Sequence, residues 1–295
     1  MPVHVELAPA KMNLGLKVLG RRPDGYHEIL SLMQTVDLAD RVTLEPTEAS
    51  GKTVVACDAE GVPEGPENLA YMAVEAVRAE TGIDTGVRVV LEKRIPAGGG
   101  LGGGSSDAAA VLRGLPHVWP VELGRERMHD VAASLGSDVP FLLRGGTAIA
   151  RGRGEVLEEA FWPGHYHFVL VDPGFRVSTA WAFSQVRIGL TAISEYAKLL
   201  NSRVEADTDW PDRLLEHLEN DFLPLVAAEY PQADDILSAL RASGAVCGSL
   251  SGTGATLYGV FRTKVASAAA AAAIRKMGYR CFICRAVSGS SDPDV

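Results

Sequence analysis

The chain has few cysteines, and their placement excludes a disulfide-stabilised fold. Its 295 residues include only four, at Cys57, Cys247, Cys281 and Cys284, too few and too scattered for a disulfide framework. Cys281 and Cys284 have the spacing of a zinc or redox pair, but no second pair accompanies them and the residues between them are apolar. We therefore expect both to be structural. The seven histidines form no metal-ligand pattern either.

Long hydrophobic runs and excess positive charge are also missing. No apolar stretch approaches the roughly 20 residues that span a bilayer, and residues 1–7 lack the basic and apolar segments of a secretory signal. We therefore expect a cytoplasmic protein without a membrane partner. Its 28 Lys and Arg against 37 Asp and Glu give a formal net charge of −9, which argues against a nucleic-acid partner. Nothing in the charge balance implies a protein partner, and an anionic substrate requires a local basic site.

Glycine, in contrast, is abundant and gathered in one segment. Residues 96–108 read Pro-Ala-Gly-Gly-Gly-Leu-Gly-Gly-Gly-Ser-Ser-Asp-Ala, with six glycines in seven positions. Glycine accepts positive φ and lets a phosphate oxygen approach backbone N–H groups without a Cβ in the way. A strand is expected before the segment, and after it a helix capped by Ser105 or Ser106 and stopped by Pro116. The positive end of that helix would face the loop and favour an anion, so the segment predicts a phosphate-binding loop.

Other interpretations of this loop fit less well. A flexible linker would not be flanked by two regular elements. A Walker A loop needs Gly-x4-Gly-Lys-Ser/Thr, and Gly51-Lys52-Thr53 supplies only its end, with Pro46 in place of the first glycine. The loop does satisfy the dinucleotide fingerprint Gly-x-Gly-x-x-Gly, but the residues leading to the required acid, Glu122, include two prolines and make a poor central strand. Protein-kinase signatures are absent.

Strands and helices are expected along the whole chain. Hydrophobic periodicity predicts strands at 3–8, 12–20, 29–37, 41–46, 87–95, 148–150, 166–172, 246–250, 255–261 and 279–287. It predicts helices at 67–81, 105–115, 125–135, 178–185, 191–200, 211–217, 232–243 and 264–277. The segment 161–164, Phe-Trp-Pro-Gly, indicates a boundary. We expect one domain over 1–160, a second over 161–288 and a disordered tail over 289–295.

Three further segments carry chemistry. Lys11 and Asn13, within Ala8-Pro-Ala-Lys-Met-Asn-Leu-Gly15, are two apart and share one side of a strand. Asp138 follows a helix-ending glycine and precedes a proline in Leu135-Gly-Ser-Asp-Val-Pro-Phe141, at the head of a tight connection. Residues 249–255, Ser-Leu-Ser-Gly-Thr-Gly-Ala, form a second glycine turn between two strands.

In this order, the four segments resemble the small-molecule kinases named after galactokinase, homoserine kinase, mevalonate kinase and phosphomevalonate kinase, over about residues 6–285. The resemblance implies an α+β fold of two domains with the active site between them. The N-terminal, ATP-binding half is expected to be similar to domain 2 of ribosomal protein S5, and the C-terminal half to be ferredoxin-like. Residues 21–27, Arg-Arg-Pro-Asp-Gly-Tyr-His, and the long glycine loop resemble one branch of the family. Its substrate is methylerythritol linked to cytidine diphosphate, in non-mevalonate isoprenoid biosynthesis.

The resemblance implies transfer of the γ-phosphoryl group of ATP to the tertiary 2-hydroxyl of that substrate. Asp138 matches the family's catalytic base and Lys11 its lysine, which would keep Asp138 ionised and stabilise transferring charge. A turn cap and a solvated strand charge are the alternatives for the two residues. Asn68 matches a position near the adenine, with a helix cap as its alternative, and Ser106 is expected to contact Mg²⁺. The expected nucleotide-binding residues are Asn68, Pro96, Gly98, Gly99, Gly100, Leu101, Gly102, Gly103, Gly104, Ser105 and Ser106.

The cytidine substrate implies a second set of residues. Tyr26 would offer a ring face to the cytosine and His27 polar contacts to its edge; the alternative for Tyr26 is a turn tyrosine packed under a loop. Residues 177–183, Val-Ser-Thr-Ala-Trp-Ala-Phe, stand where the family has Pro-Thr-Pro, although Ser178 and Ala180 replace both prolines. In this register Thr179 would bind polar groups of the substrate, and Phe183 would be the second ring against the cytosine. The expected substrate residues are Asn13, Tyr26, His27, Thr179, Phe183, Gly252 and Gly254.

Two other functions remain open at this point. The chain could be another kinase of the same family, acting on mevalonate or homoserine, but those substrates contain no base for Tyr26 to stack on. It could also be a silent relative that senses a sugar or nucleotide. The presence of both Lys11 and Asp138 argues against that second alternative.

Overall fold

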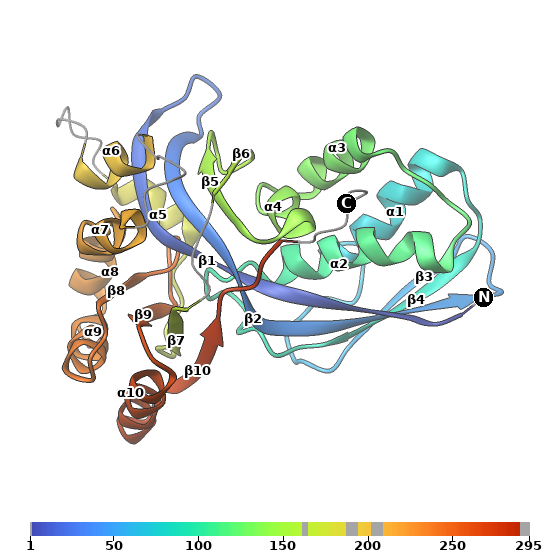
Figure 1. Ribbon diagram of the computed structural model, residues 1–295. Coiled ribbons are helices and arrows are strands. Elements are labelled where there is room, and N and C mark those ends of the chain that lie inside the picture. Colours follow the sequence, from blue (N-terminus) through green and yellow to red (C-terminus); the bar gives the residue numbers. More distant parts are fainter. Residues whose placement is uncertain (1, 161–164, 187–193, 202–208, 290–295) are drawn as a thin grey trace.

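The computed structural model of the protein describes residues 2–160, 165–186, 194–201 and 209–289. Two β-sheets stand side by side, each with helices of its own (Figure 1). The first sheet has six strands in the order β3-β4-β2-β5-β6, with β1 paired to β2. Its strands are β1 (His4–Arg21), β2 (His27–Thr47), β3 (Thr53–Cys57), β4 (Gly86–Glu92), β5 (Thr147–Arg151) and β6 (Val156–Glu159). β3 and β4 are parallel, and the other neighbouring strands are antiparallel.

Four helices lie on one face of the first sheet (Figure 1). They are α1 (Leu69–Thr81), α2 (Gly103–Val118), α3 (Arg125–Leu135) and α4 (Val139–Arg144). Their small and branched side chains, including Ala73, Val77 and Leu112, pack on alternate residues of β4 such as Val87 and Val89. This core holds α2, and with it the glycine loop at its N-terminus, against the sheet.

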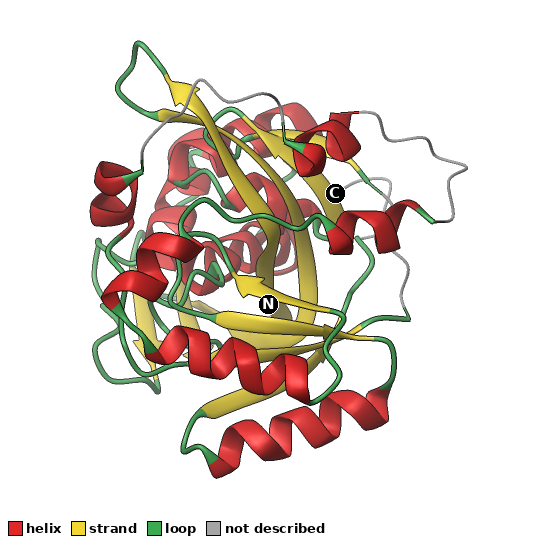
Figure 2. Cartoon of the chain, turned by 90° about the vertical axis from the view of Figure 1, so that its left-hand side faces the viewer, coloured by secondary structure: helices red, strands yellow, loops and turns green. Residues whose placement is uncertain are grey.

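The second sheet is antiparallel, in the order β10-β7-β9-β8. Its strands are β7 (His167–Asp172), β8 (Cys247–Leu250), β9 (Leu257–Phe261) and β10 (Arg280–Arg285). Its helices are α5 (Thr179–Gln185), α6 (Glu195–Asn201), α7 (Trp210–Glu216), α8 (Leu223–Glu229), α9 (Gln232–Ala242) and α10 (Lys264–Lys276), and Figure 2 looks at the molecule from this side. Helices join β7 to β8 and β9 to β10, which is the split βαβ arrangement of a ferredoxin-like fold.

The two sheets share a hydrophobic core. Met12 and Leu14 of β1 and Leu32 of β2 belong to the same buried cluster as Phe168 and Tyr258 of the second sheet. The chain also returns to the first sheet after β10, where the Val287 N–H donates to the Thr35 carbonyl at 2.9 Å. The long strands β1 and β2 therefore belong to both halves of the molecule.

Several elements differ from the sequence prediction. β1 and β2 are single long strands, because register shifts such as the one between Pro9 and Lys11 bend the pair without ending it. The helix after the glycine loop begins earlier than predicted, at Gly103, with Gly102 at φ +68° as its cap instead of a serine. It also continues through Pro116 to Val118, because a proline this close to the helix end disrupts only the last turn.

Four short elements have no counterpart in the prediction. These are β3, α4, β6 and α8. β3 lies in a segment rich in glycine, proline and acidic residues, and it forms because β4 offers it a partner. The expected boundary at 161–164, the start of the helix expected at 191–200 and residues 290–295 of the expected tail lie outside the described residues. Among the helices of the described ranges, none combines the length and apolar character that crossing a bilayer requires.

Candidate active site

The glycine loop connects β4 to α2 in a conformation that depends on glycine. Gly98, Gly100 and Gly102 have φ of +68°, +75° and +68°, values that other residues rarely adopt. At Gly100 a Cβ would lie 2.6 Å from the Ser251 carbonyl oxygen and 2.7 Å from that of Gly254. The first residues of α2 leave their N–H groups free of helical partners at the loop, which is compatible with the predicted phosphate site.

Lys11, Asn13 and Asp138 come together beside this loop. The Lys11 Nζ lies 3.2 Å from Asp138 Oδ2 and donates to Asn13 Oδ1 at 2.9 Å. Asn13 is fixed in turn, because its Nδ2 donates to the Ser31 hydroxyl at 2.8 Å. The Lys11 backbone N–H donates to the Leu101 carbonyl of the glycine loop at 3.0 Å. One strand therefore positions the ammonium relative to both the carboxylate and the loop.

Asp138 is the residue that precedes α4, yet its carboxylate makes no cap hydrogen bond among the described residues. Its side chain is 28% exposed, whereas that of Lys11 is 8% exposed. The carboxylate thus has a fixed cationic partner on one side and solvent access on the other. This arrangement suits a base that must reach a bound substrate, and the capping role weighed for Asp138 is not what the structure shows.

The second glycine turn lies directly on the first. The Thr256 N–H donates to the Gly99 carbonyl at 3.1 Å, and the Ser251 hydroxyl donates to the Gly100 carbonyl at 3.2 Å. At Gly252 a Cβ would lie 3.1 Å from Asn13 Oδ1. The structure therefore brings the four segments singled out from the sequence into one place.

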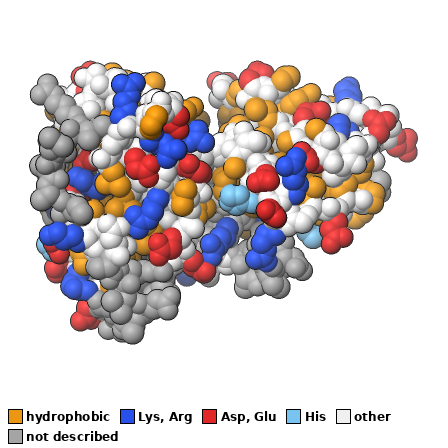
Figure 3. All heavy atoms as spheres, turned by 90° about the horizontal axis from the view of Figure 1, so that it is seen from above, with side chains coloured by type: hydrophobic (Ala, Val, Ile, Leu, Met, Phe, Trp, Pro, Cys, Tyr) orange, Lys and Arg blue, Asp and Glu red, His pale blue; other side chains and the backbone are white. Residues whose placement is uncertain are grey.

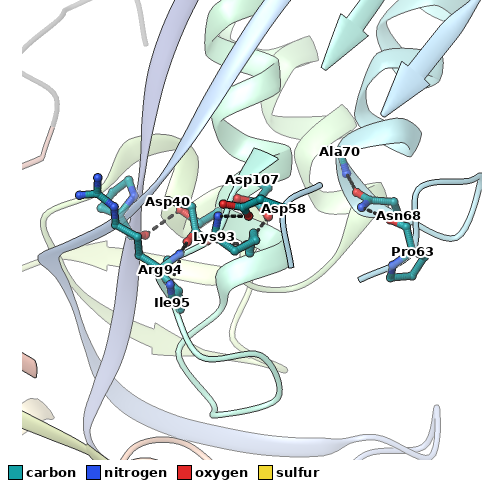
Figure 4. A network of polar contacts seen from close by, with 11 residues as sticks. Asp40, Asp58, Pro63, Asn68, Ala70, Lys93, Arg94, Ile95 and Asp107 are labelled. Atoms are coloured by element: carbon teal, nitrogen blue, oxygen red, sulfur yellow. Dashed lines mark hydrogen bonds and ion pairs between the residues drawn. The ribbon is translucent and has the colours of Figure 1, made fainter. Parts of the chain in front are cut away.

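Two expected nucleotide residues are engaged within the protein. The Asn68 Oδ1 accepts from the Ala70 N–H at 2.8 Å as the cap of α1, and its Nδ2 donates to the Pro63 carbonyl at 2.6 Å (Figure 4). These bonds match the helix-cap alternative. The Ser106 hydroxyl is fully buried and donates to the Pro9 carbonyl at 2.7 Å, so it does not fit the expected Mg²⁺ contact.

Among the described residues, no cluster of metal-ligand side chains lies at the glycine loop. The one group of three such side chains in the described part of the chain is His4, Glu6 and His117. His117 lies in the last turn of α2, whereas the glycine loop precedes the first turn of the same helix. The cluster is therefore at the opposite end of the helix from the loop.

The residues expected to bind cytidine line one cleft of about 1300 Å³. Tyr26, His27, Thr179 and Phe183 all contribute to it. The rings of His27 and Phe183 stack with centroids 5.0 Å apart, while Tyr26 is 56% exposed with the Arg153 guanidinium carbon 4.7 Å from its ring centroid. The cleft therefore gathers these aromatic side chains, and Phe183, expected to be the second ring against the cytosine, stacks on His27.

Sequence reasoning missed the cations of this cleft. Arg21 and Arg153 line it. Arg21 opens the segment 21–27 but was given no role there, and Arg153 belongs to no motif. Acidic and basic side chains are interspersed on the face drawn in Figure 3. Attraction of an anionic ligand therefore depends on local cations such as these.

A buried ion-pair cluster beneath the loop was also missed. The Lys93 ammonium contacts Asp40 and Asp107, and Figure 4 shows how the three side chains converge. Burial raises the pKa of Asp107 to about 7, and the neighbouring Lys93 charge opposes this rise. Asp107 lies inside the predicted motif, but no spacing in the sequence links it to Asp40.

Comparisons with known proteins agree with this arrangement. The family models for the GHMP kinases N terminal domain and the GHMP kinases C terminal match residues 68–146 and 199–280. The 4-diphosphocytidyl-2-C-methyl-D-erythritol kinase of Geobacter sp. (strain M21) is 39% identical over 280 residues, covering 92% of this chain and 94% of that protein. The protein of the same name from Pelotomaculum thermopropionicum (strain DSM 13744 / JCM 10971 / SI) is 39% identical, covering 96% and 98%.

Solved structures give the same result. A crystal structure of 4-(cytidine 5'-diphospho)-2C-methyl-D-erythritol kinase has a TM-score of 0.80 and 34% identity, covering 97% of this chain and 100% of that one. Homoserine kinase from Cytophaga hutchinsonii has a TM-score of 0.77 at 17% identity, covering 98% and 96%, and shares the fold. The two family models together match more than half of the chain, and the relatives are 39% identical over most of its length. The chain therefore belongs to the GHMP kinases, in the family of the 4-diphosphocytidyl-2-C-methyl-D-erythritol kinases.

Proposed function

We propose that the chain transfers the γ-phosphoryl group of ATP to the 2-hydroxyl of 4-diphosphocytidyl-2-C-methyl-D-erythritol, with Asp138 as the base and Lys11 as its electrostatic partner. The observation that carries the proposal is the 3.2 Å contact between Lys11 and Asp138 beside the glycine loop. The names of the relatives support the choice of substrate. We also propose the cytoplasm as its location and 1–160 and 161–288 as its two domains.

The roles follow from the demands of phosphoryl transfer, which requires mainly positioning and neutralisation of charge. Asp138 accepts the proton of the attacking hydroxyl. The Lys11 ammonium favours the ionised carboxylate and offsets negative charge on the nucleophile and the transferring group. Asn13 keeps the ammonium in place through its 2.9 Å hydrogen bond.

The nucleotide phosphates are assigned to the glycine loop and the N-terminus of α2. Backbone N–H groups over 100–105 bind the phosphate oxygens, and the helix dipole adds to the attraction. The N–H group of Ser106 already donates to the Gly102 carbonyl at 2.8 Å. Mg²⁺ binds phosphate oxygens and water readily, so we assign it to the nucleotide, where it offsets phosphate charge. We do not assign Ser106 as its ligand, because the hydroxyl of this residue is buried and donates to the Pro9 carbonyl.

The cleft lined by Tyr26, His27, Thr179 and Phe183 is assigned to the cytidine end of the substrate. A cytosine can stack on an aromatic face, and the exposed Tyr26 ring provides one. Arg21 and Arg153 on the cleft wall supply charge for the diphosphate. Mevalonate and homoserine would use none of these groups.

The test is an assay of the purified protein with ATP and Mg²⁺ on the cytidyl substrate, mevalonate and homoserine in parallel. We expect turnover of the cytidyl substrate alone. Asp138→Asn should lower kcat by about 100-fold to 10,000-fold, the usual contribution of a general base, without loss of ATP binding. Asp130→Asn is the matched control, because this aspartate on α3 is 58% exposed and pairs only loosely with Arg127 at 3.6 Å.

Three outcomes would each contradict a part of the proposal. Turnover of mevalonate or homoserine would refute the cytidine assignment of Tyr26 and His27. ATP binding without turnover of any of the three alcohols would favour a sensor. Equal activity of Asp138→Asn and the wild type would remove Asp138 as the base even if the substrate were right.

A further inference from the structure

Three charged side chains are buried beneath the glycine loop and have no part in the chemistry proposed above. Lys93 follows β4, Asp40 lies in β2 and Asp107 lies in the second turn of α2. Their side chains are 8%, 0% and 3% exposed. The ammonium of Lys93 donates to both carboxylates (Figure 4).

The acidic side chains also bind the backbone that leads into the loop. Asp40 Oδ1 accepts from the N–H groups of Arg94 and Ile95, the second at 2.8 Å. Asp58 Oδ1 accepts from the Lys93 N–H at 2.8 Å. Three consecutive N–H groups after β4 are therefore held by carboxylates, and the next residue is a proline without an N–H group.

The same ammonium reaches the other end of the loop. A Cβ at Gly103, the first residue of α2, would lie 3.6 Å from Lys93 Nζ. The side chain of Asp107 leans toward the N-terminus of its helix, as helical side chains do, and meets Lys93 there. The residues before the loop are thus tied to Lys93 through Asp40, and the residues after it through Asp107.

Stability does not explain this cluster. Taking charges out of water is costly, and replacing a buried ion pair by packed apolar groups of similar volume often leaves a protein equally stable. In addition, Asp107 Oδ1 is buried without a hydrogen-bond partner in the described part of the chain. What the cluster does provide is a fixed separation between the two ends of the loop.

We propose that Asp40, Lys93 and Asp107 form a positioning unit that sets the spacing between the two ends of the phosphate-binding loop and thereby its affinity for nucleotide phosphates. This inference rests on the proposed function, because it takes the loop to be the nucleotide site. None of the three side chains touches the reacting atoms, so they act through the backbone N–H groups that they hold.

The test is calorimetric titration of ATP into Asp107→Ala and the wild type without the alcohol substrate. Loss of a hydrogen bond to a charged group should raise the Kd for ATP by about tenfold. In the assay, the KM for ATP should rise by a similar factor, while kcat and the KM for the alcohol stay within about twofold. Asp107→Asn should restore affinity, because its amide oxygen can still accept from Lys93.

Glu6→Gln is the matched control for a general loss of stability. Glu6 of β1 pairs at 3.3 Å with Arg113, which lies on α2 about two turns further from the loop than Asp107. This variant should lower the melting temperature and leave the Kd for ATP unchanged. If Asp107→Ala does not fold, Lys93→Arg takes its place, since a planar guanidinium keeps the charge but not the geometry, and the same rise in Kd is expected.

The outcomes separate the two proposals. A folded Asp107→Ala protein that binds ATP as the wild type does would overturn the positioning unit alone. An equal loss of affinity in Glu6→Gln would also overturn it, since the effect would then be one of stability. A wild-type protein that binds no ATP would refute the proposed function and, with it, this inference.

Discussion

Tyr26 is the side chain whose substitution separates the cytidine assignment from every other part of the site. It is 56% exposed, so its removal should not disturb the fold. Tyr26→Leu should raise the KM for the cytidyl substrate by about tenfold, since stacking on a base contributes about 1–3 kcal/mol, and leave the KM for ATP unchanged. Steady-state kinetics with each substrate varied in turn would measure both constants.

Tyr230→Leu serves as the control for this prediction. Its ring stacks on Phe175 at 4.1 Å, and neither ring belongs to the residues that line the cleft. An unchanged KM in Tyr26→Leu would mean that the cytosine lies elsewhere. The stacked rings of His27 and Phe183 would then be the next place to look for it.

Individual side chains also show the limit of sequence reasoning. Lys11, Asn13 and Asp138 could be chosen because they stand in segments that match the motifs of a known kinase family. Ser106 and Asn68 could not be assigned in the same way, because their partners, the carbonyls of Pro9 and Pro63, are set by the fold. A hydroxyl or an amide side chain forms hydrogen bonds with whichever polar group the tertiary structure places near it.

The glycine loop yields a prediction about backbone geometry. Gly100→Ala would place a Cβ 2.6 Å from the Ser251 carbonyl oxygen at a φ of +75°, so either the loop or the second glycine turn must move. We expect a melting temperature at least a few degrees lower and a large loss of ATP affinity. Differential scanning calorimetry and ATP titration would measure the two effects.

Gly104→Ala is the control for Gly100→Ala, because it adds the same methyl group where there is room for it. Apart from its chain neighbours and the backbone of its own helix, the nearest described atom to a Cβ there is Leu69 Cδ1 at 3.8 Å, and the position is helical. This variant should gain roughly 0.5–1 kcal/mol of stability from reduced backbone entropy in the unfolded state. If Gly100→Ala were as stable as Gly104→Ala, the contact between the two glycine turns would not matter.

The longer elements with strong periodicity were predicted, whereas four short elements, β3, α4, β6 and α8, were not. The helix predicted at 125–135 has these bounds in the structure, because its sequence ends at Gly136. β3 and α4 have five and six residues, too few for a periodic pattern to be visible, and they form through contacts with neighbouring elements. The glycine that starts α2 was missed because a left-handed cap depends on the path of the loop, not on the serines after it.

The stability of the whole molecule should fall in alkaline solution. Burial raises the pKa of Cys247 and of Cys284 from an ordinary value of 9.0 to about 12, and it raises the pKa of Tyr258 as well. Between these values the unfolded chain releases protons that the folded chain retains, so unfolding becomes more favourable as pH rises above 9. Below that pH the contribution of both thiols to stability is fully present.

Urea unfolding followed by fluorescence at about pH 8 and about pH 10 would measure this dependence. The midpoint should be lower at the higher pH. The double variant Cys247→Ala/Cys284→Ala removes both thiols and should show a smaller difference between the two conditions. An equal difference in the double variant would show that other groups control alkaline unfolding.

The relation between the two halves is the part of the fold that the sequence did not reveal. Each half has a recognisable order of strands and helices, but the contact between the two halves depends on individual side chains that pack or bond across it. The Tyr196 hydroxyl, for example, donates to the Leu14 carbonyl at 2.7 Å and accepts from the Leu32 N–H at 3.1 Å. No local pattern indicates that an α6 side chain joins β1 to β2.

The core shared by the two sheets has a consequence for how such kinases can diversify. Met12 and Leu32 on β1 and β2 pack in the same cluster as Phe168 and Tyr258 of the other sheet. A chimaera that takes residues 1–160 from this chain and the remainder from a relative must therefore keep both sides of that packing compatible. Chimaeras that exchange loops within one half should fold more often than chimaeras that exchange a whole half. The substrate range of such kinases would then evolve through substitutions in the cleft and not through exchange of domains.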